Sequence, residues 1–133
     1  MLAHEVLRAA ADVVRAGWSE GSAAARDGDG REVNLYGAAV GGTSRVGINP
    51  EAARFSVYGA VAKVLTTAQG GPATGIMWLR LADLAKARSP ARPGGSNHMR
   101  PLVQFNADPE RTAEDVIALL LEAADALAPV ASC

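Results

Sequence analysis

The chain has 133 residues, and its 13 basic and 14 acidic side chains give a formal net charge of −1 at pH 7. No stretch concentrates lysine or arginine, so the basic surface of a nucleic-acid-binding protein is not expected. Hydrophobic residues make up 49% of the chain and aromatic residues only 5%; because much of the apolar part is alanine, closely packed helices in one domain spanning residues 1–133 are expected.

The chain has too few cysteines and histidines to suggest a fold held by disulfide bonds or by a metal ion. The single cysteine is Cys133, so no intrachain disulfide can form, and a cytoplasmic location is the simplest expectation. Charges at Glu5, Arg8 and Asp12 interrupt the apolar residues near the N-terminus, which argues against a secretion signal or a membrane span. With only two histidines and one cysteine, we expect no metal site. Because the chain has no glycine-rich phosphate-binding motif, we also expect no cofactor.

A first amphipathic helix is predicted over residues 2–16, where apolar residues recur every three or four positions. Gly17 follows as the expected terminator. Trp18 comes four residues after Val14, so its ring can fold back onto the apolar face of the helix. Two interpretations remain open, and an anchor in the core is favoured over a ring lining a pocket.

The glycine-rich segment after this helix, residues 17–31, combines an aromatic ring, an arginine and paired carboxylates. Asp27 and Asp29 are spaced like the first ligands of a calcium loop, but Arg31 and Glu32 occupy the places of the next ligand and the turn glycine. A turn in which aspartates cap backbone amides is therefore the favoured interpretation. The alternative gives Arg26 or Asp27 a functional role.

The middle of the chain is predicted as a long loop followed by a buried helix. Glycines break residues 33–49, which favours a loop, with a short hairpin as the alternative. A nearly uniform apolar helix is predicted over residues 51–68, with Asn49 as N-cap and Pro50 in the first turn. Gly59 inside it suggests that a neighbouring helix crosses closely there.

The last part of the chain contains two further predicted helices. One spans residues 73–88 and places Trp78 on its apolar face. A proline- and glycine-rich loop over residues 89–101 follows, and its His98 is a candidate general base. Residues 102–106 are predicted as a short extended element, and Thr112 as the N-cap of the final helix.

Three blocks of the sequence together resemble a family of small uncharacterised proteins of actinobacteria and their phages. The first, from Gly17-Trp18 to Arg31, has a GWxxG…ARDxxG pattern, and the others are residues 53–60 and Phe105-Asn106 with Arg111-Thr112. The chain has one extra small residue between Gly21 and Ala25. It also has Ala107 where an aspartate is usual. The resemblance implies a domain of unknown function, without an assigned activity.

These observations predict an all-α fold, a compact bundle of about four helices with long glycine- and proline-rich loops. The first functional hypothesis is a non-catalytic binding or accessory protein that acts as a homo-oligomer, most simply a homodimer, with a protein partner as a further option. The second is a small enzyme or small-molecule binder. Its ligand would lie between the buried helix and the first loop, against Trp18, Tyr58 and Trp78, with Arg26 holding an anion and Asp27 or His98 moving a proton.

Overall fold

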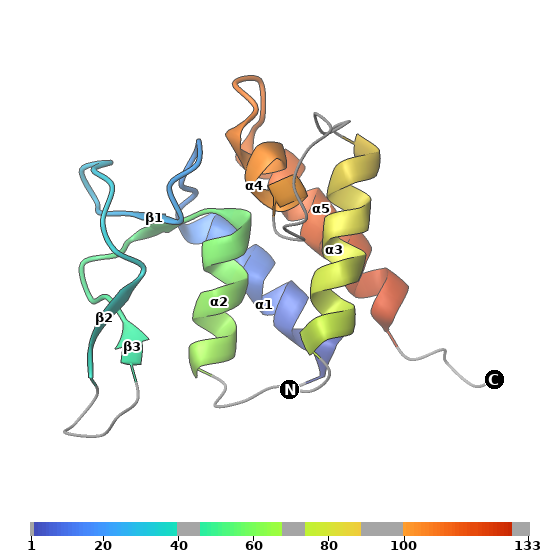
Figure 1. Ribbon diagram of the computed structural model, residues 1–133, viewed down its shortest axis with the longest axis horizontal. Coiled ribbons are helices and arrows are strands. Elements are labelled where there is room, and N and C mark those ends of the chain that lie inside the picture. Colours follow the sequence, from blue (N-terminus) through green and yellow to red (C-terminus); the bar gives the residue numbers. More distant parts are fainter. Residues whose placement is uncertain (1, 40–45, 68–73, 89–99, 129–133) are drawn as a thin grey trace.

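The protein is mainly helical in the parts that a computed structural model describes, which are residues 2–39, 46–67, 74–88 and 100–128 (Figure 1). These parts contain the helices α1 (Ala3–Ala16), α2 (Val57–Thr67), α3 (Thr74–Arg88), α4 (Arg100–Ala107) and α5 (Ala113–Leu127). They also contain the strands β1 (Ala25–Arg26), β2 (Tyr36–Ala39), β3 (Val46–Ile48) and β4 (Arg54–Phe55). The strictly all-α prediction is therefore wrong, as is the count of about four helices, because five helices and two small sheets are present in the described residues.

Helix α1 is central to the packing, with α5 along one side and α2 along another. Arg8 in the first half of α1 contacts Asp125 near the end of α5, so these two helices run antiparallel. Helix α3 packs on α4 and α5. The buried face of α1 is made of Val6, Leu7, Ala10, Ala11 and Val14. These small side chains allow the neighbouring helices to approach closely.

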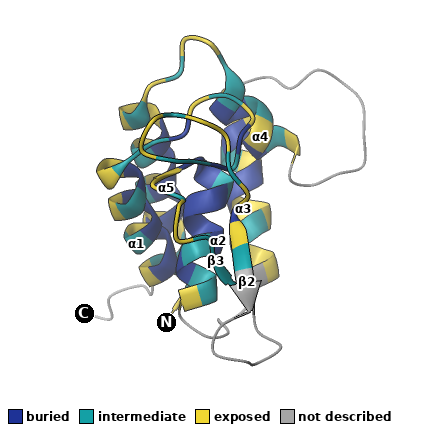
Figure 2. Ribbon diagram, turned by 90° about the vertical axis from the view of Figure 1, so that its left-hand side faces the viewer, coloured by how far each residue is buried: buried dark blue, intermediate teal, exposed yellow. Residues whose placement is uncertain are grey.

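Two-stranded sheets flank the helices on the side shown in Figure 2, where the loops carry much of the exposed surface. Strand β1 pairs antiparallel with β4, with Ala25 opposite Phe55. Strands β2 and β3 pair antiparallel, with Tyr36 opposite Ile48. The short hairpin offered as an alternative for residues 33–49 is therefore confirmed.

The buried helix begins later than predicted, at Val57 rather than near residue 51. The Ser56 hydroxyl accepts a hydrogen bond from the Gly59 amide at 3.0 Å, which makes Ser56 the N-cap. The Asn49 side chain instead accepts from the Glu51 amide at 3.0 Å and closes a local turn. Asparagine favours both arrangements because its carbonyl can cap either a helix or a turn, so the local sequence did not distinguish them.

The predicted extended element at residues 102–106 is also wrong, since these residues lie within α4. Pro101 fits the first turn of this helix, where no amide donor is needed. Leu102, Phe105 and Asn106 are buried, a three- and four-residue spacing that only a helix places on one face. The predicted N-cap of α5 is confirmed, because Thr112 and Asp115 cap each other's backbone amides.

No helix in the described parts of the chain has both the length and the apolar character that crossing a membrane requires.

Candidate functional site

The segment from Trp18 to Arg31 leaves α1 at Gly17 and runs beside β4. The Ser19 amide donates to the Phe55 carbonyl and the Phe55 amide donates to the Gly17 carbonyl, both at 3.0 Å. A Cβ atom at Gly17 would stand 2.6 Å from the Ala53 carbonyl oxygen, so this exit from α1 requires glycine. The segment is thus held against the start of α2 from its first residue.

Asn106 on α4 connects this segment to α2 and is 1% exposed. Its Oδ1 atom accepts hydrogen bonds from the Trp18 indole Nε1 at 2.9 Å and from the Val57 amide at 3.1 Å. Its Nδ2 atom donates to the carbonyls of Ser19 and Gly21, each at 2.8 Å. All four hydrogen-bonding positions of the amide are therefore used, as burial of a polar side chain requires.

Trp18 is consequently neither a plug at the centre of the core nor a free pocket wall. Its ring is half-buried and packs against the core, while the indole N–H is committed to Asn106. Sequence reasoning placed Asn106 in a matching block but assigned it no role. The one feature of the sequence that could have indicated its role is the spacing of Asn106 with Leu102 and Phe105. This spacing places an asparagine on the apolar face of a short helix.

Arg26 and Asp27, the two charged candidates, do not pair with each other. The Arg26 guanidinium donates from Nη1 to the Gly30 carbonyl at 2.9 Å and from Nη2 to the Glu20 carbonyl at 3.3 Å. The Asp27 Oδ1 atom accepts from the amides of Asp29 at 3.0 Å and of Arg31 at 2.9 Å. Both side chains therefore stabilise the backbone of their own loop.

The turn interpretation of this loop is confirmed for Asp27, which caps two amides, and for Gly30. Gly30 has φ +86°, a left-handed conformation that favours glycine, and its amide donates to the Asp27 carbonyl at 3.1 Å. Arg54, which pairs with Arg26 in the β1–β4 register, donates from Nη2 to the Gly28 carbonyl at 3.2 Å. Two neighbouring guanidinium groups thus cap carbonyls of one loop.

The structure brings together two of the three predicted aromatic residues. The rings of Tyr58 and Trp78 have centroids 5.6 Å apart and planes inclined by 30°, within the usual range of aromatic pairs. Tyr36, which is 45% exposed, lies near Tyr58: partial burial raises the pKa of its phenol, the Tyr58 hydroxyl adds to the increase, and Thr66 opposes it. Trp18 instead contacts Asn106, so the three predicted aromatic residues do not form one binding wall.

A small cavity of about 30 Å³ lies at the start of α2, bordered by the loop and by α4. Its lining consists of Gly21, Ser22, Ala24, Ser56, Val57, Tyr58, Leu102, Val103 and Asn106. Such a volume accommodates a water molecule or two, well below the roughly 300 Å³ of a typical metabolite pocket. A second, open hollow of about 450 Å³ is polar and is bordered by Glu32, Val33, Asn34, Asn49 and Glu51.

At Gly59, α2 approaches the backbone of the loop closely. A Cβ atom there would overlap the Ala24 carbonyl oxygen, and the Ser56 amide donates to the same oxygen at 3.0 Å. The close neighbour that the sequence indicated is therefore the backbone of the loop, not another helix. A glycine inside an apolar helix indicates a close contact, but the sequence around it does not show which element makes the contact.

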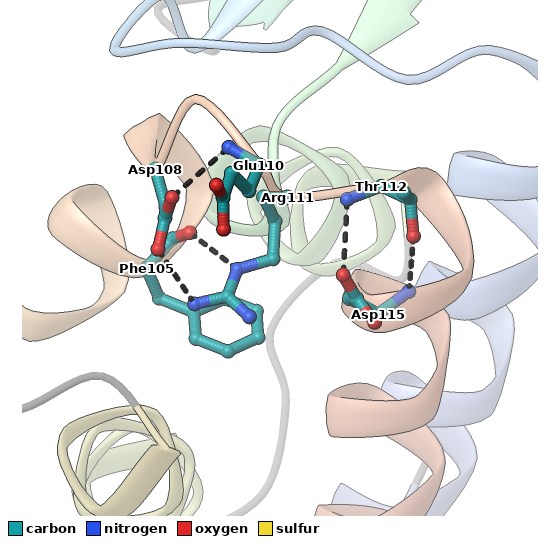
Figure 3. A network of polar contacts seen from close by, with 6 residues as sticks. All are labelled: Phe105, Asp108, Glu110, Arg111, Thr112 and Asp115. Atoms are coloured by element: carbon teal, nitrogen blue, oxygen red, sulfur yellow. Dashed lines mark hydrogen bonds and ion pairs between the residues drawn. The ribbon is translucent and has the colours of Figure 1, made fainter.

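A second polar network holds the connection between α4 and α5 (Figure 3). The Arg111 guanidinium lies 3.7 Å from the centre of the Phe105 ring, and its Nε atom donates to the Phe105 carbonyl at 2.9 Å. It also pairs with Asp108 at 3.5 Å. Because Phe105 precedes Asn106, this network fixes the end of α4 that carries the Asn106 amide.

Of the two histidines, one lies in the part of the chain that the structure describes. His98 lies outside the described residues, and His4 on α1 contacts Arg8. In the described ranges, no three histidine, cysteine, aspartate or glutamate side chains gather closely enough to hold a metal ion.

Comparison with known protein families gives one family that matches most of the chain. A family of unknown function, DUF6197, matches residues 1–126. The chain belongs to this family. No curated protein and no solved structure matches the DUF6197 chain. The match supports the sequence-based resemblance at the level of a domain of unknown function, while the GWxxG…ARDxxG motif and the actinobacterial or phage origin stay predictions.

Proposed function

We propose that this protein is a non-catalytic binding or accessory protein that acts as a homo-oligomer. The observation that supports the proposal is that polar side chains in the Trp18–Arg31 segment, and Asn106 on α4 beside it, hydrogen-bond to the protein itself. The Arg26 guanidinium donates to two loop carbonyls, Asp27 accepts from two loop amides, and Asn106 makes four hydrogen bonds. A catalytic site instead aims such groups at a substrate.

Surface composition supports association with another protein. Ile76 and Leu79 on α3 are 62% and 50% exposed, and Val103 on α4 is 38% exposed. Single exposed apolar residues are ordinary, but two on one face of a helix suit a contact surface. A homodimer is the simplest such assembly, because most homo-oligomers have closed symmetry.

The proposal is tested by sedimentation velocity on the purified chain from about 5 to about 500 µM, a range that covers weak association. A sedimentation coefficient that rises with concentration toward that of a dimer is the expected result. A strictly monomeric chain across the range contradicts self-association.

The alternative, a small-molecule binder or enzyme using Arg26 with Asp27 or His98, has weaker support. The cavity beside the loop holds about 30 Å³, and of the predicted ligand-contacting residues only Tyr58 borders it. A thermal-shift screen of metabolites tests it directly. A metabolite that raises the melting temperature of the wild-type chain, but not of Arg26→Ala or Asp27→Ala, would favour this alternative over the accessory role.

A further inference from the structure

Helix α3 presents a continuous exposed stripe on the side opposite its core contacts. The buried side is formed by Met77, Leu81, Ala82 and Ala85. The exposed residues are Ile76, Leu79, Arg80, Asp83 and Ala87. Their i, i+3, i+4, i+7 and i+11 spacing places them together along one face. We call these five residues the α3 stripe.

The α3 stripe combines apolar side chains with two opposite charges. Ile76 and Leu79 are 62% and 50% exposed. Within the described parts of the chain, Arg80 and Asp83 form no ion pair, whereas Arg88 at the end of the helix pairs with Glu122 on α5. The two charges at the middle of the stripe are therefore available to another molecule.

We infer that the α3 stripe is the contact surface for a second copy of this chain, whose α3 docks antiparallel across a two-fold axis. This inference rests on the proposed self-association and names its surface. With the axis midway between positions 80 and 83, Arg80 faces Asp83 of the partner subunit, and the symmetry repeats this pair. In the same register, Ile76 faces Ala87 of the partner subunit.

Charge complementarity selects this arrangement over the parallel one. In a parallel two-fold pair, equivalent residues meet, so Arg80 would face Arg80 of the partner subunit. Like charges opposite each other disfavour association, whereas two opposite pairs favour it and fix the register. Lys86 lies at the edge of the stripe by helical spacing and can keep its ammonium group in water.

The size of the stripe predicts a weak dimer. A contact one helix wide buries less than about 1,200 Å² in total, the range of transient complexes. Reversible association in the micromolar range is therefore expected, and it should weaken with added salt because the two ion pairs lie near solvent.

Charge reversal and swapping test the register. Arg80→Glu or Asp83→Arg alone places two like-charged pairs across the axis, so each should weaken dimerisation at least about tenfold at low salt. The double variant restores opposite charges and should recover the wild-type dissociation constant within about threefold. Arg31→Glu makes the same charge change at an exposed loop position and should leave dimerisation unchanged.

The outcomes separate this inference from the proposed function. Circular dichroism first establishes that each variant folds, which exposed positions should allow. A wild-type dimer that persists in both single variants and in Leu79→Ser overturns the α3 assignment but leaves self-association standing. Failure of the double variant to recover overturns the antiparallel register and with it this inference. A monomeric wild-type chain overturns both.

Discussion

Replacing Asn106 with alanine should destabilise the fold more than any other single polar-to-alanine change near the loop. The substitution removes the acceptor of the Trp18 indole and of the Val57 amide, and the donor to the carbonyls of Ser19 and Gly21. Two of these bonds, to Val57 and Ser19, are fully buried. Among the described residues these two backbone groups have no other hydrogen-bond partner, so the substitution leaves them buried and unpaired.

The magnitude follows from the two buried groups. Each unpaired buried group costs about 1–3 kcal/mol, so Val57 and Ser19 together cost about 2–6 kcal/mol. Water can enter from the adjoining cavity of about 30 Å³ and recover part of this loss. We therefore expect Asn106→Ala to lower the free energy of unfolding by about 2–4 kcal/mol, a large share of the 5–15 kcal/mol of a typical domain.

Urea denaturation followed by far-UV circular dichroism and tryptophan fluorescence measures this loss. Asn34→Ala is the matched control, because Asn34 is exposed and its removal should change stability by less than about 0.5 kcal/mol. An Asn106→Ala variant within about 0.5 kcal/mol of wild type would refute the reasoning that this amide holds the loop.

Asn106→Asp tests the donor half of the same amide. One carboxyl oxygen keeps the Trp18 and Val57 donors, which favour the ionised form, while the other faces the carbonyls of Ser19 and Gly21. Burial and these two carbonyl oxygens outweigh the donors and raise the folded pKa above the unfolded value of about 4. A raised folded pKa means that the folded state holds the proton longer, so stability falls as pH rises above the unfolded pKa. The deficit relative to wild type should therefore be smaller at pH 4 than at pH 7, and an equal deficit at both would contradict the geometry.

Two further features yield contrasting predictions. Gly59→Ala should destabilise the protein by about 2 kcal/mol or more despite alanine's better helix propensity, because the added Cβ meets the Ala24 carbonyl. Gly75→Ala, which has open space around it in α3, should stabilise the protein by about 0.5–1 kcal/mol. Equal effects of the two variants in urea denaturation would contradict the close contact at Gly59. The Tyr36 phenol should ionise above pH 10. Alkaline absorbance titrations of the wild-type chain and of Tyr36→Phe measure this, because their difference is the titration of Tyr36. Because folding favours its neutral form, stability should fall as pH rises above 10, and a midpoint at or below 10 would exclude the burial and Tyr58 contact that raise the pKa.

Several elements followed directly from local patterns in the sequence. Apolar spacing identified α1 and α3, and Thr112 with its acidic neighbours identified the start of α5. The turn at Asp27 was also predictable, since alternating aspartate and glycine residues satisfy their own backbone. In each case the deciding interactions lie within a few residues of one another.

The site was predictable only in part, because its central contacts join distant segments. Asn106 lies more than 80 positions from Trp18 and Ser19, and no local pattern reveals that its amide would bridge α4, the loop and the first turn of α2. Trp78 was expected on the apolar face of its helix and Tyr58 beside it in a ligand pocket, but their pairing depends on how α2 and α3 pack. The function class stayed open for the same reason.

By itself, then, the sequence determined helices with a strong period, one capping box and one self-contained turn, because these depend on short-range hydrogen bonds and on which side chains avoid water. Tertiary structure decided the rest. Strand β4 pairs with β1. Arg54 and Phe55, which the local sequence predicts as part of a helix, therefore lie in a sheet. Asn106 offers the Val57 amide an acceptor, so a distant side chain satisfies the first donor of α2 beside the local Ser56 cap.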